Sequence, residues 1–132
     1  MSDFLKLKKR REFLRVAQKG ERVVTTSLIM QAAHSLSKEQ VEPKFGFTTT
    51  KKLGHAVVRN KARRRLRAVV REIYKNHACK NTEYVLIGRY STAECDFLNL
   101  LKDLKYAFKK SHKLLYGDDY EANDVETDNH SN

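Results

Sequence analysis

Nine cationic side chains lie between Lys51 and Arg71, and they are the residues of this sequence best suited to specific chemistry. The nine are Lys51, Lys52, Arg59, Lys61, Arg63, Arg64, Arg65, Arg67 and Arg71. A guanidinium group is planar and donates parallel hydrogen bonds that match the oxygen geometry of a phosphate. Closely spaced arginines therefore indicate a surface that binds the phosphate backbone of a nucleic acid.

The apolar residues of the same region repeat with the period of an α-helix. They form one stripe, which predicts a helix over about residues 57–75: Ala62, Leu66, Val69, Val70 and Ile73. At about 100° per residue, an arc roughly 140° wide beside this stripe holds Arg59, Asn60, Arg63, Arg64, Arg67 and Arg71. One side of the helix is thus expected to pack while another presents guanidinium groups. Asn60 can also donate and accept hydrogen bonds toward a sugar or a base edge.

A run of charges is more often an ordinary solvated helix face. Solvated helices, however, usually combine opposite charges three or four residues apart. Here Glu72 is the only acid of the stretch. The charge pattern therefore favours contact with nucleic acid over simple solvation.

The charge of the whole chain indicates the same kind of partner. Lys and Arg number 27 and Asp and Glu number 16, and residues 1–116 contain all 27 cations but only 10 of the acids, a net charge of +17. Such a surplus repels itself and favours a polyanionic partner. An anionic membrane is the weaker alternative, because the apolar runs are short and the N-terminus lacks the apolar core of a secretion signal. We expect a cytoplasmic protein that does not bind a membrane.

Residue types that support protein-based hydrolysis or metal binding are sparse. Cys79 and Cys95 form neither a disulfide framework nor a Cys-x-x-Cys pair, and the five histidines have no ligand spacing. The basic segment also lacks the clustered carboxylates that would hold two metal ions. The sequence therefore predicts no catalytic residue and no metal site in the protein itself.

The remaining elements follow from periodicity and turn residues. Residues 9–19 have apolar positions at helical spacing, followed by Gly20 as a stop, and residues 44–50 alternate as a strand does. Residues 22–33 are rich in β-branched side chains and form either one bent strand or two short ones. Residues 83–89 resemble a strand buried on both faces. Ser91 and Glu94 have the spacing of a capping box for a last helix, whose stripe is Phe97, Leu101, Leu104 and Phe108.

This order predicts an α+β fold, a single-domain α/β sandwich with a central sheet and the sequence α-β-β-β-α-β-α. We assign residues 1–116 to that domain. Residues 117–132 contain six acids and no Lys or Arg, with little apolar surface to bury. We expect this acidic tail to be disordered.

The segment KFGFTTTKKLGHAVVRNKARRRLR, residues 44–67, closely resembles the characteristic motif of the bacterial ribonuclease P protein family. In that motif a strand ending in Ser/Thr-x-Ser/Thr-Lys-Lys leads through x-Gly-x-Ala-Val into a helix that begins Arg-Asn-Arg. The segments KKRREFLRVAQKG and EYVLIGR are similar to the family's first helix and final strand, so the resemblance covers roughly residues 6–110. Three positions depart from it: Lys61 replaces the second Arg of the motif, Ala17 stands where many relatives have a second aromatic, and Gln31 where some have Tyr.

The resemblance implies a fold, a partner and a division of labour. The unit of strand, basic helix and strand would have a left-handed crossover, against the general right-handed rule. The protein would bind the catalytic RNA subunit of ribonuclease P together with precursor tRNA and assist removal of the 5′ leader. The RNA subunit, using Mg²⁺, would hydrolyse the phosphodiester bond. The protein alone would bind no cofactor and need no obligate protein partner.

Two surfaces are implied for this chain. The RNA-subunit surface comprises Lys51, Lys52, Arg59, Asn60, Lys61, Arg63, Arg64 and Arg67. The leader surface is a cleft comprising Phe13, Gln31, Thr48, Thr50 and Lys52, in which Phe13 would stack on a base and the threonine hydroxyls would reach sugar or phosphate groups. The alternatives are a core position for Phe13 and ordinary strand positions for the two threonines. Phe45 and Phe47 alternate with those threonines and are expected in the core.

Two other functions compete with this hypothesis. A general RNA-binding or ribosomal protein would have the same composition, but it would purify with ribosomes instead of with one structured RNA. A DNA-binding protein would insert the basic helix into the major groove. It is disfavoured because strand-like segments flank that helix on both sides, leaving no helix-turn-helix pair.

Overall fold

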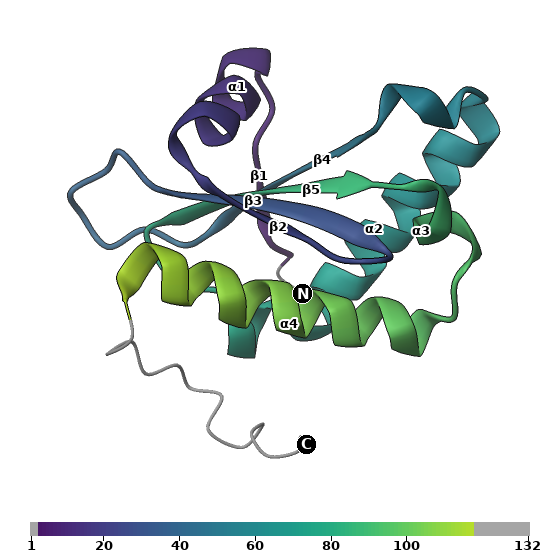
Figure 1. The fold of residues 1–132 in the computed structure, drawn as a ribbon. Helices are drawn as coiled ribbons and strands as arrows, with labels where there is room; N and C mark the ends of the chain where they lie inside the picture. The colour runs from purple at the N-terminus through teal and green to yellow at the C-terminus, as the bar shows by residue number, and fades with distance from the viewer. Residues whose placement is uncertain (1–2, 118–132) are drawn as a thin grey trace.

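The computed structural model describes residues 3–117 as one five-stranded sheet with helices on both faces (Figure 1). The elements in chain order are β1 (Leu5–Lys6), α1 (Arg10–Lys19), β2 (Glu21–Val24), β3 (Leu28–His34), β4 (Lys44–Thr49), the 3₁₀ helix η1 (Lys51–Leu53), α2 (Ala56–His77), β5 (Thr82–Gly88), α3 (Tyr90–Glu94) and α4 (Phe97–Tyr116). The predicted fold class, an α+β sandwich around a central sheet, is confirmed. The predicted disordered tail lies outside the described residues, except for Gly117.

The strand order across the sheet is β1-β4-β5-β3-β2. β4 pairs in parallel with both β1 and β5, whereas β3 is antiparallel to β5 and to β2. Because β4 and β5 are parallel neighbours and α2 lies between them in the sequence, they form the predicted β-α-β unit. The left-handed sense of its crossover stays an expectation from the family resemblance.

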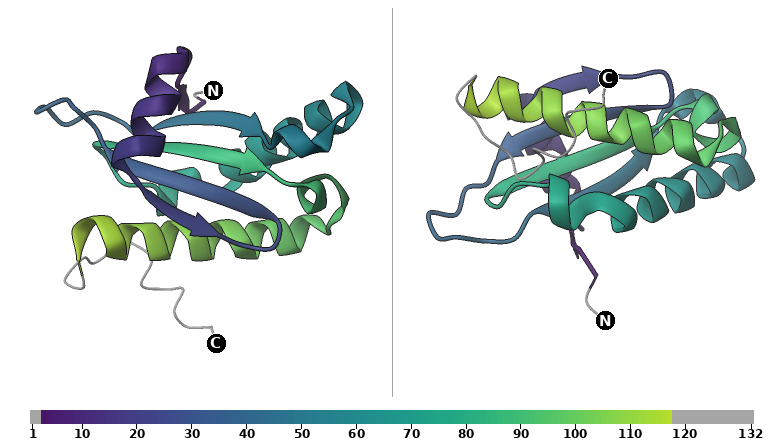
Figure 2. Two further views of the ribbon diagram at one scale, coloured as in Figure 1. Left: turned by 45° about the horizontal axis from the view of Figure 1, so that its top comes forward. Right: turned by 90° about the horizontal axis from the view of Figure 1, so that it is seen from below.

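The helices divide between the two faces of the sheet (Figure 2). α2 and α4 pack on one face, where the main core forms around Phe45, Leu66, Tyr84 and Phe108, all of them buried. α1 packs on the other face over a smaller cluster of Leu7, Val16, Ala33 and Val85, with Phe13 and Ile87 against it.

Alternation along β4 explains which of its side chains reach the main core. Successive strand residues point to opposite faces. Phe45 is fully buried in the main core and Phe47 packs against it, as predicted. Gly46 and Thr48 therefore face the α1 side, where one helix covers only part of the sheet.

Three features of the fold were left open, missed or predicted wrongly from the sequence. Residues 22–33 contain two strands, β2 and β3, which is one of the two alternatives. β1 has two residues, too few for a periodic pattern to show in the sequence. The capping box at Ser91 and Glu94 is wrong: the chain forms the short helix α3 there and breaks before α4, whose N-cap is Asp96. The hydroxyl of Ser91 donates instead to the backbone oxygen of Thr26, and Thr92 caps α3 by accepting from the Arg89 amide.

Gly20 ends α1 as predicted, but through close packing and not through a left-handed backbone. Its φ of −98° and ψ of 179° are extended. A Cβ atom at this position would lie 2.4 Å from the backbone oxygen of Ala32 and 2.7 Å from that of Val16. Only glycine lets α1 approach β3 this closely, and this approach places α1 over the sheet.

Candidate nucleic-acid interface

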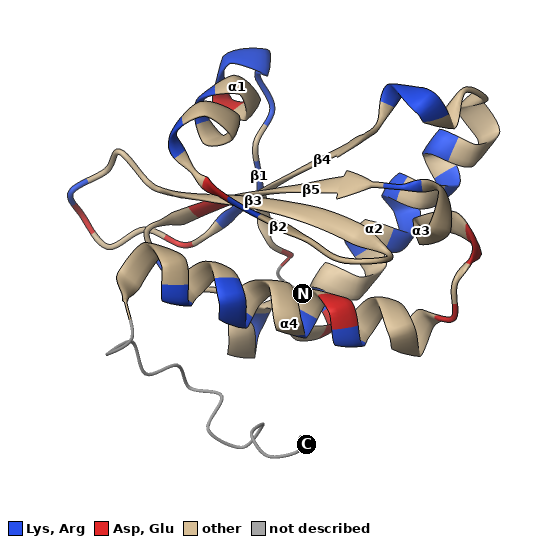
Figure 3. Ribbon diagram, viewed as in Figure 1, with Lys and Arg blue, Asp and Glu red and all other residues tan. Residues whose placement is uncertain are grey.

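The cations of the predicted basic surface follow one another along the chain from η1 through α2, where Figure 3 marks their positions in blue on the ribbon. Lys51, Lys52, Lys61 and Arg64 are exposed, and Arg63 and Arg67 are partly exposed. The opposite side of α2 is buried through the predicted stripe of Ala62, Leu66, Val69, Val70 and Ile73. None of these six cations forms an ion pair with an acid within residues 3–117. Their charge is therefore available to an anionic partner.

Asn60 orients one of the arginines on this surface. Nη2 of Arg63 donates to Oδ1 of Asn60 at 2.5 Å, across one turn of the helix. This bond fixes the guanidinium group against the helix and leaves its other N–H groups free to donate outward. The Asn60 amide nitrogen stays available as a donor. The pair presents donors suited to phosphate and sugar oxygens.

Three arginines of the basic segment also form hydrogen bonds within the protein. Arg65 donates to the backbone oxygen of Thr92 at 2.8 Å and so ties α2 to α3. Arg59 donates to the backbone oxygen of Gly54, which closes the turn before α2. Arg71 pairs with the Asp3 carboxylate at 3.1 Å and lies over the Phe4 ring. Its guanidinium hydrogen bonds hold the pKa of Asp3 below the ordinary value. The helical wheel alone does not separate Arg59 and Arg71 from the cations that carry no such bond.

The predicted leader cleft corresponds to a groove of about 460 Å³ between α1 and the sheet. Its lining residues are Lys8, Arg10, Phe13, Leu14, Ala17, Gln31, Phe47, Thr48 and Val85. Sheet register brings them together, because Gln31 and Gly46 both pair with Val85 and thus form one row across three strands. Three predicted leader residues, Phe13, Gln31 and Thr48, therefore lie in one groove.

The other two predicted leader residues lie outside the groove lining. Thr50 follows the end of β4, where its amide donates to the backbone oxygen of Gly88 at 3.1 Å. Lys52 is exposed in η1, between the end of β4 and the start of α2. Both residues lie on the segment that connects the groove to the basic surface.

Phe13 belongs to the groove wall and to the smaller core at once. It is partly exposed and packs against the cluster beneath α1. A Cβ atom on Gly46 would lie 2.6 Å from Cζ of Phe13, so the ring occupies the space that a side chain on β4 would fill. The two alternatives for Phe13 are therefore not exclusive. The ring is held in place on the sheet while part of it faces the groove.

Lys8 and Arg10 are groove residues that the site prediction missed. Both are exposed at the start of α1, and the basic run at residues 8–11 was the available signal. Glu12, the only acid of α1, forms no ion pair with either of them: its Oε1 accepts from the amides of Lys8 and Lys9 at 2.8 and 2.9 Å. These backbone hydrogen bonds lower the pKa of Glu12 and keep it ionised as a cap. The groove thus has a cationic rim.

Residues 3–117 offer no group of three or more His, Cys, Asp or Glu side chains arranged to hold a metal ion. Within the same residues, no helix combines the length and apolarity needed to cross a membrane.

Comparison with known proteins decides the family. The family model described as ribonuclease P matches residues 1–112. The chain belongs to the ribonuclease P protein family. A ribonuclease P protein component from Gluconacetobacter diazotrophicus is 43% identical over 107 residues, which cover 80% of this chain and 90% of the relative. The component from Paramagnetospirillum magneticum is also 43% identical over 107 residues, covering 80% of each chain.

Solved structures support the same assignment. The RNase P protein of Staphylococcus aureus aligns with a TM-score of 0.64 at 27% identity, covering 80% of this chain and 93% of the other. The RNase P protein from Thermotoga maritima shares the fold, with a TM-score of 0.67 at 22% identity over 80% of this chain and 96% of the other. As a family member, the chain is a component of an endoribonuclease that processes tRNA, a ribonucleoprotein in which its partner is RNA.

Proposed function

We propose that this chain binds the catalytic RNA subunit of ribonuclease P through η1 and α2 and binds the 5′ leader of precursor tRNA in the groove beside α1. The observation that carries the proposal is the continuity of the two surfaces. β4 contributes Thr48 to the groove, and the residues that follow contribute Lys51 and Lys52 to the basic surface. A single strand-to-helix connection thus links the two proposed RNA contacts.

The α2 surface supports binding to a folded RNA. Apart from Arg71, which pairs with Asp3, its cations carry no ion pair within the described residues, so phosphates would replace only water and counterions. Arg63, Arg64 and Arg67 offer planar donors that fit phosphate oxygens, and Lys61 adds charge without a guanidinium fork. The surface follows the 22-residue helix α2, which is long enough to contact several phosphates of a structured RNA.

The groove supports binding to a single strand with little sequence preference. The exposed part of the Phe13 ring can stack on any base, because every base has a π-face. Lys8 and Arg10 lie where the phosphates of that strand would need compensation, and Gln31 and the Thr48 hydroxyl can reach sugar or phosphate oxygens. Ala17 and Gln31 reduce the aromatic area in this groove relative to many relatives. We therefore expect a modest leader affinity.

We further propose that the hydrolysis is carried by the RNA subunit with its Mg²⁺, because neither surface of the protein has the carboxylates to hold such an ion. The protein freed of RNA is expected to have no precursor-tRNA cleavage activity. Adding the cognate RNA at low Mg²⁺ is expected to restore 5′ maturation, measured by gel separation of leader and mature tRNA. Cleavage activity that elutes with RNA-free protein would contradict this division of labour.

Binding to the RNA subunit is expected to weaken steeply with salt. Each phosphate that the protein neutralises contributes about −0.7 to −0.9 to the slope of log K against log salt concentration. Because η1 and α2 present at least six unpaired cations, we expect a slope of several units in filter-binding titrations. An affinity that hardly changes between about 50 and 200 mM salt would rule out the α2 surface as a phosphate-binding site.

Replacing Phe13 with Ala is expected to reduce the preference for precursor over mature tRNA by about 1 kcal/mol, the lower end of the value of one base–aromatic stack. Assembly with the RNA subunit should stay nearly unchanged, because Phe13 lies on α1, away from α2. Phe13→Leu is the matched control, since it retains apolar contact with Gly46 but loses the ring. If both variants bind precursor as the original protein does, or if Phe13→Ala prevents assembly, the groove is not the leader site.

A further inference from the structure

A second group of cations lies on the outer side of α4, apart from both surfaces described above (Figure 3). Five exposed lysines and one exposed aromatic form this stripe: Lys102, Lys105, Tyr106, Lys109, Lys110 and Lys113. At about 100° per residue the lysines span an arc of roughly 140°, and Tyr106 falls within it. The other side of α4 is buried in the main core through Leu100, Leu104 and Phe108.

The stripe is electrostatically unfavourable in the isolated protein. Lys105, Lys109 and Lys113 follow one another four residues apart, and like charges at this spacing destabilise a helix. Asp103 is the only acid on α4, and its Oδ2 already accepts from the amide and hydroxyl of Ser27 at 3.1 and 2.7 Å. No lysine of the stripe has an ion pair within residues 3–117. An anionic partner would remove this repulsion.

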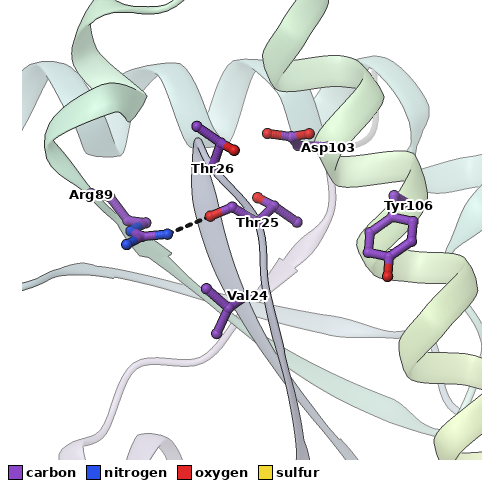
Figure 4. A pocket seen from close by; sticks show the side chains of 6 residues that line it. All are labelled: Val24, Thr25, Thr26, Arg89, Asp103 and Tyr106. Atoms are coloured by element: carbon purple, nitrogen blue, oxygen red, sulfur yellow. Dashed lines mark hydrogen bonds between the residues drawn. The ribbon is translucent and has the colours of Figure 1, made fainter.

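An open hollow of about 450 Å³ lies beside the stripe, at the turn between β2 and β3 (Figure 4). Its lining residues are Val24, Thr25, Thr26, Arg89, Asp103 and Tyr106. Val24 and Tyr106 are each 54% exposed, so the hollow has apolar and aromatic surface that no described residue covers. Arg89 is fixed by donating through Nη1 to the backbone oxygen of Thr25. The hollow therefore combines an aromatic ring, a positioned cation and a carboxylate.

We propose that the stripe and the hollow, together called the α4 surface, bind an unpaired segment of RNA. One base lies against the Tyr106 ring in the hollow, because an aromatic ring stacks on any unpaired base. The flanking phosphates lie on the lysines that neighbour Tyr106 on the helix, Lys102, Lys109 and Lys110. The remaining N–H groups of Arg89 donate to the base or its phosphate, and Oδ1 of Asp103 accepts from an exocyclic amine.

The pairing of an aromatic with cations distinguishes this partner from other polyanions. A DNA or RNA duplex would satisfy the lysines but leave Tyr106 and Val24 uncovered, since its bases are stacked on one another. The unpaired RNA belongs either to the catalytic RNA or to precursor tRNA, and the chemistry of the site is the same for both. Only this choice of source rests on the proposed function.

The direct test is NMR titration of the full-length protein with an unstructured RNA heptanucleotide of mixed sequence. We expect saturable amide shifts at Thr25, Thr26 and Arg89 and along α4, in addition to shifts at Gln31 and Thr48 in the groove. Tyr106→Ala should raise the dissociation constant obtained from the shifts at Thr25, Thr26, Arg89 and α4 about fivefold or more. The dissociation constant obtained from the groove shifts should stay unchanged. Shifts confined to the groove and α2 would overturn the α4 surface. Shifts absent from the groove but present on α4 would instead count against the proposed leader site.

Holoenzyme measurements identify the source of the RNA. The variant combining Tyr106→Ala with Lys109→Gln and Lys110→Gln is expected to lower by tenfold or more either assembly with the catalytic RNA or affinity for precursor tRNA. Loss of assembly assigns the catalytic RNA as the occupant, and loss of precursor affinity assigns the substrate. Leu98→Ala, an exposed change in the first turn of α4, is the control and should alter neither. A triple variant that folds and alters neither affinity would overturn the proposal.

Discussion

Replacing Arg63 and Arg67 with glutamate is expected to weaken assembly with the RNA subunit by several kcal/mol at low salt, roughly 100-fold or more in Kd. The two residues lie one turn apart on the same side of α2, and neither has an ion pair within the described residues. The double change removes two of the proposed phosphate contacts and adds two charges that repel phosphate. Filter binding or fluorescence anisotropy with labelled RNA subunit measures the change.

The matched control reverses the same number of charges elsewhere. Lys19 at the end of α1 and Lys38 in the loop before β4 are exposed, and neither lines the groove or belongs to the α4 surface. Lys19→Glu with Lys38→Glu changes the net charge equally but should weaken assembly far less. If the two double variants weaken assembly to the same extent, net charge and not the α2 surface determines binding. Circular dichroism at matched temperature verifies that both variants fold.

Much of this fold is predictable because strong periodicity decides it. The apolar stripe of α2 and the alternation of Phe45 and Phe47 in β4 both point to the core that the structure contains. The errors occur where one sequence pattern fits two different structures, or where an element is too short to show a pattern. Ser91 and Glu94 have the spacing of a capping box, but tertiary hydrogen bonds use Ser91 and Thr92 to fix α3 against the β2–β3 turn. β1 exists only because Leu5 and Lys6 meet the edge of β4.

The residue types of the candidate site are predictable from the sequence, but the hydrogen-bond and ion-pair partners of those residues are not. The sequence shows which cations share a side of α2, yet only the structure shows that Arg65 and Arg71 bond within the protein. The groove depends on register across β3, β5 and β4, which no local pattern encodes. Lys8 and Arg10 enter the groove because α1 packs closely against β3 at Gly20. The lysines of α4 lie opposite a strong apolar stripe, which is also the pattern of an ordinary solvated helix face, so the sequence alone does not single them out.

The protein is also expected to lose stability in mild acid, and His112 is the cause. This ring is buried in the main core region, where Nε2 lies 2.6 Å from Oη of Tyr84. The amide of Cys79 donates to the same Tyr84 oxygen at 2.9 Å, so Oη of Tyr84 bridges the backbone before β5 and the imidazole ring. Burial, with a smaller contribution from His77, lowers the pKa of His112 from 6.5 to about 4.

The sign of the pH dependence follows from proton binding in the two states. Between pH 6.5 and about 4 the unfolded chain binds a proton at His112 and the folded chain does not, so unfolding is favoured as the pH falls. The stabilisation is complete above pH 6.5 and decreases by about 3 kcal/mol down to pH 4. The lowered pKa of Asp3 acts below this window and the lowered pKa of Glu12 acts only at its acid end, because their ordinary values are 3.8 and 4.5.

Urea unfolding at pH 7 and pH 5 measures the effect on the free energy of unfolding. His112→Gln retains an acceptor for the Tyr84 hydroxyl but does not titrate, so this variant should be less stable at pH 7 and nearly independent of pH between 5 and 7. Replacing the exposed His55 with Gln is the control and should preserve the original pH dependence. A His112→Gln variant whose stability still falls by the original amount would show that another group titrates. Because His112 packs between Tyr84 and Phe108 beneath the sheet, its protonation would loosen α4 and the sheet strands that position the groove.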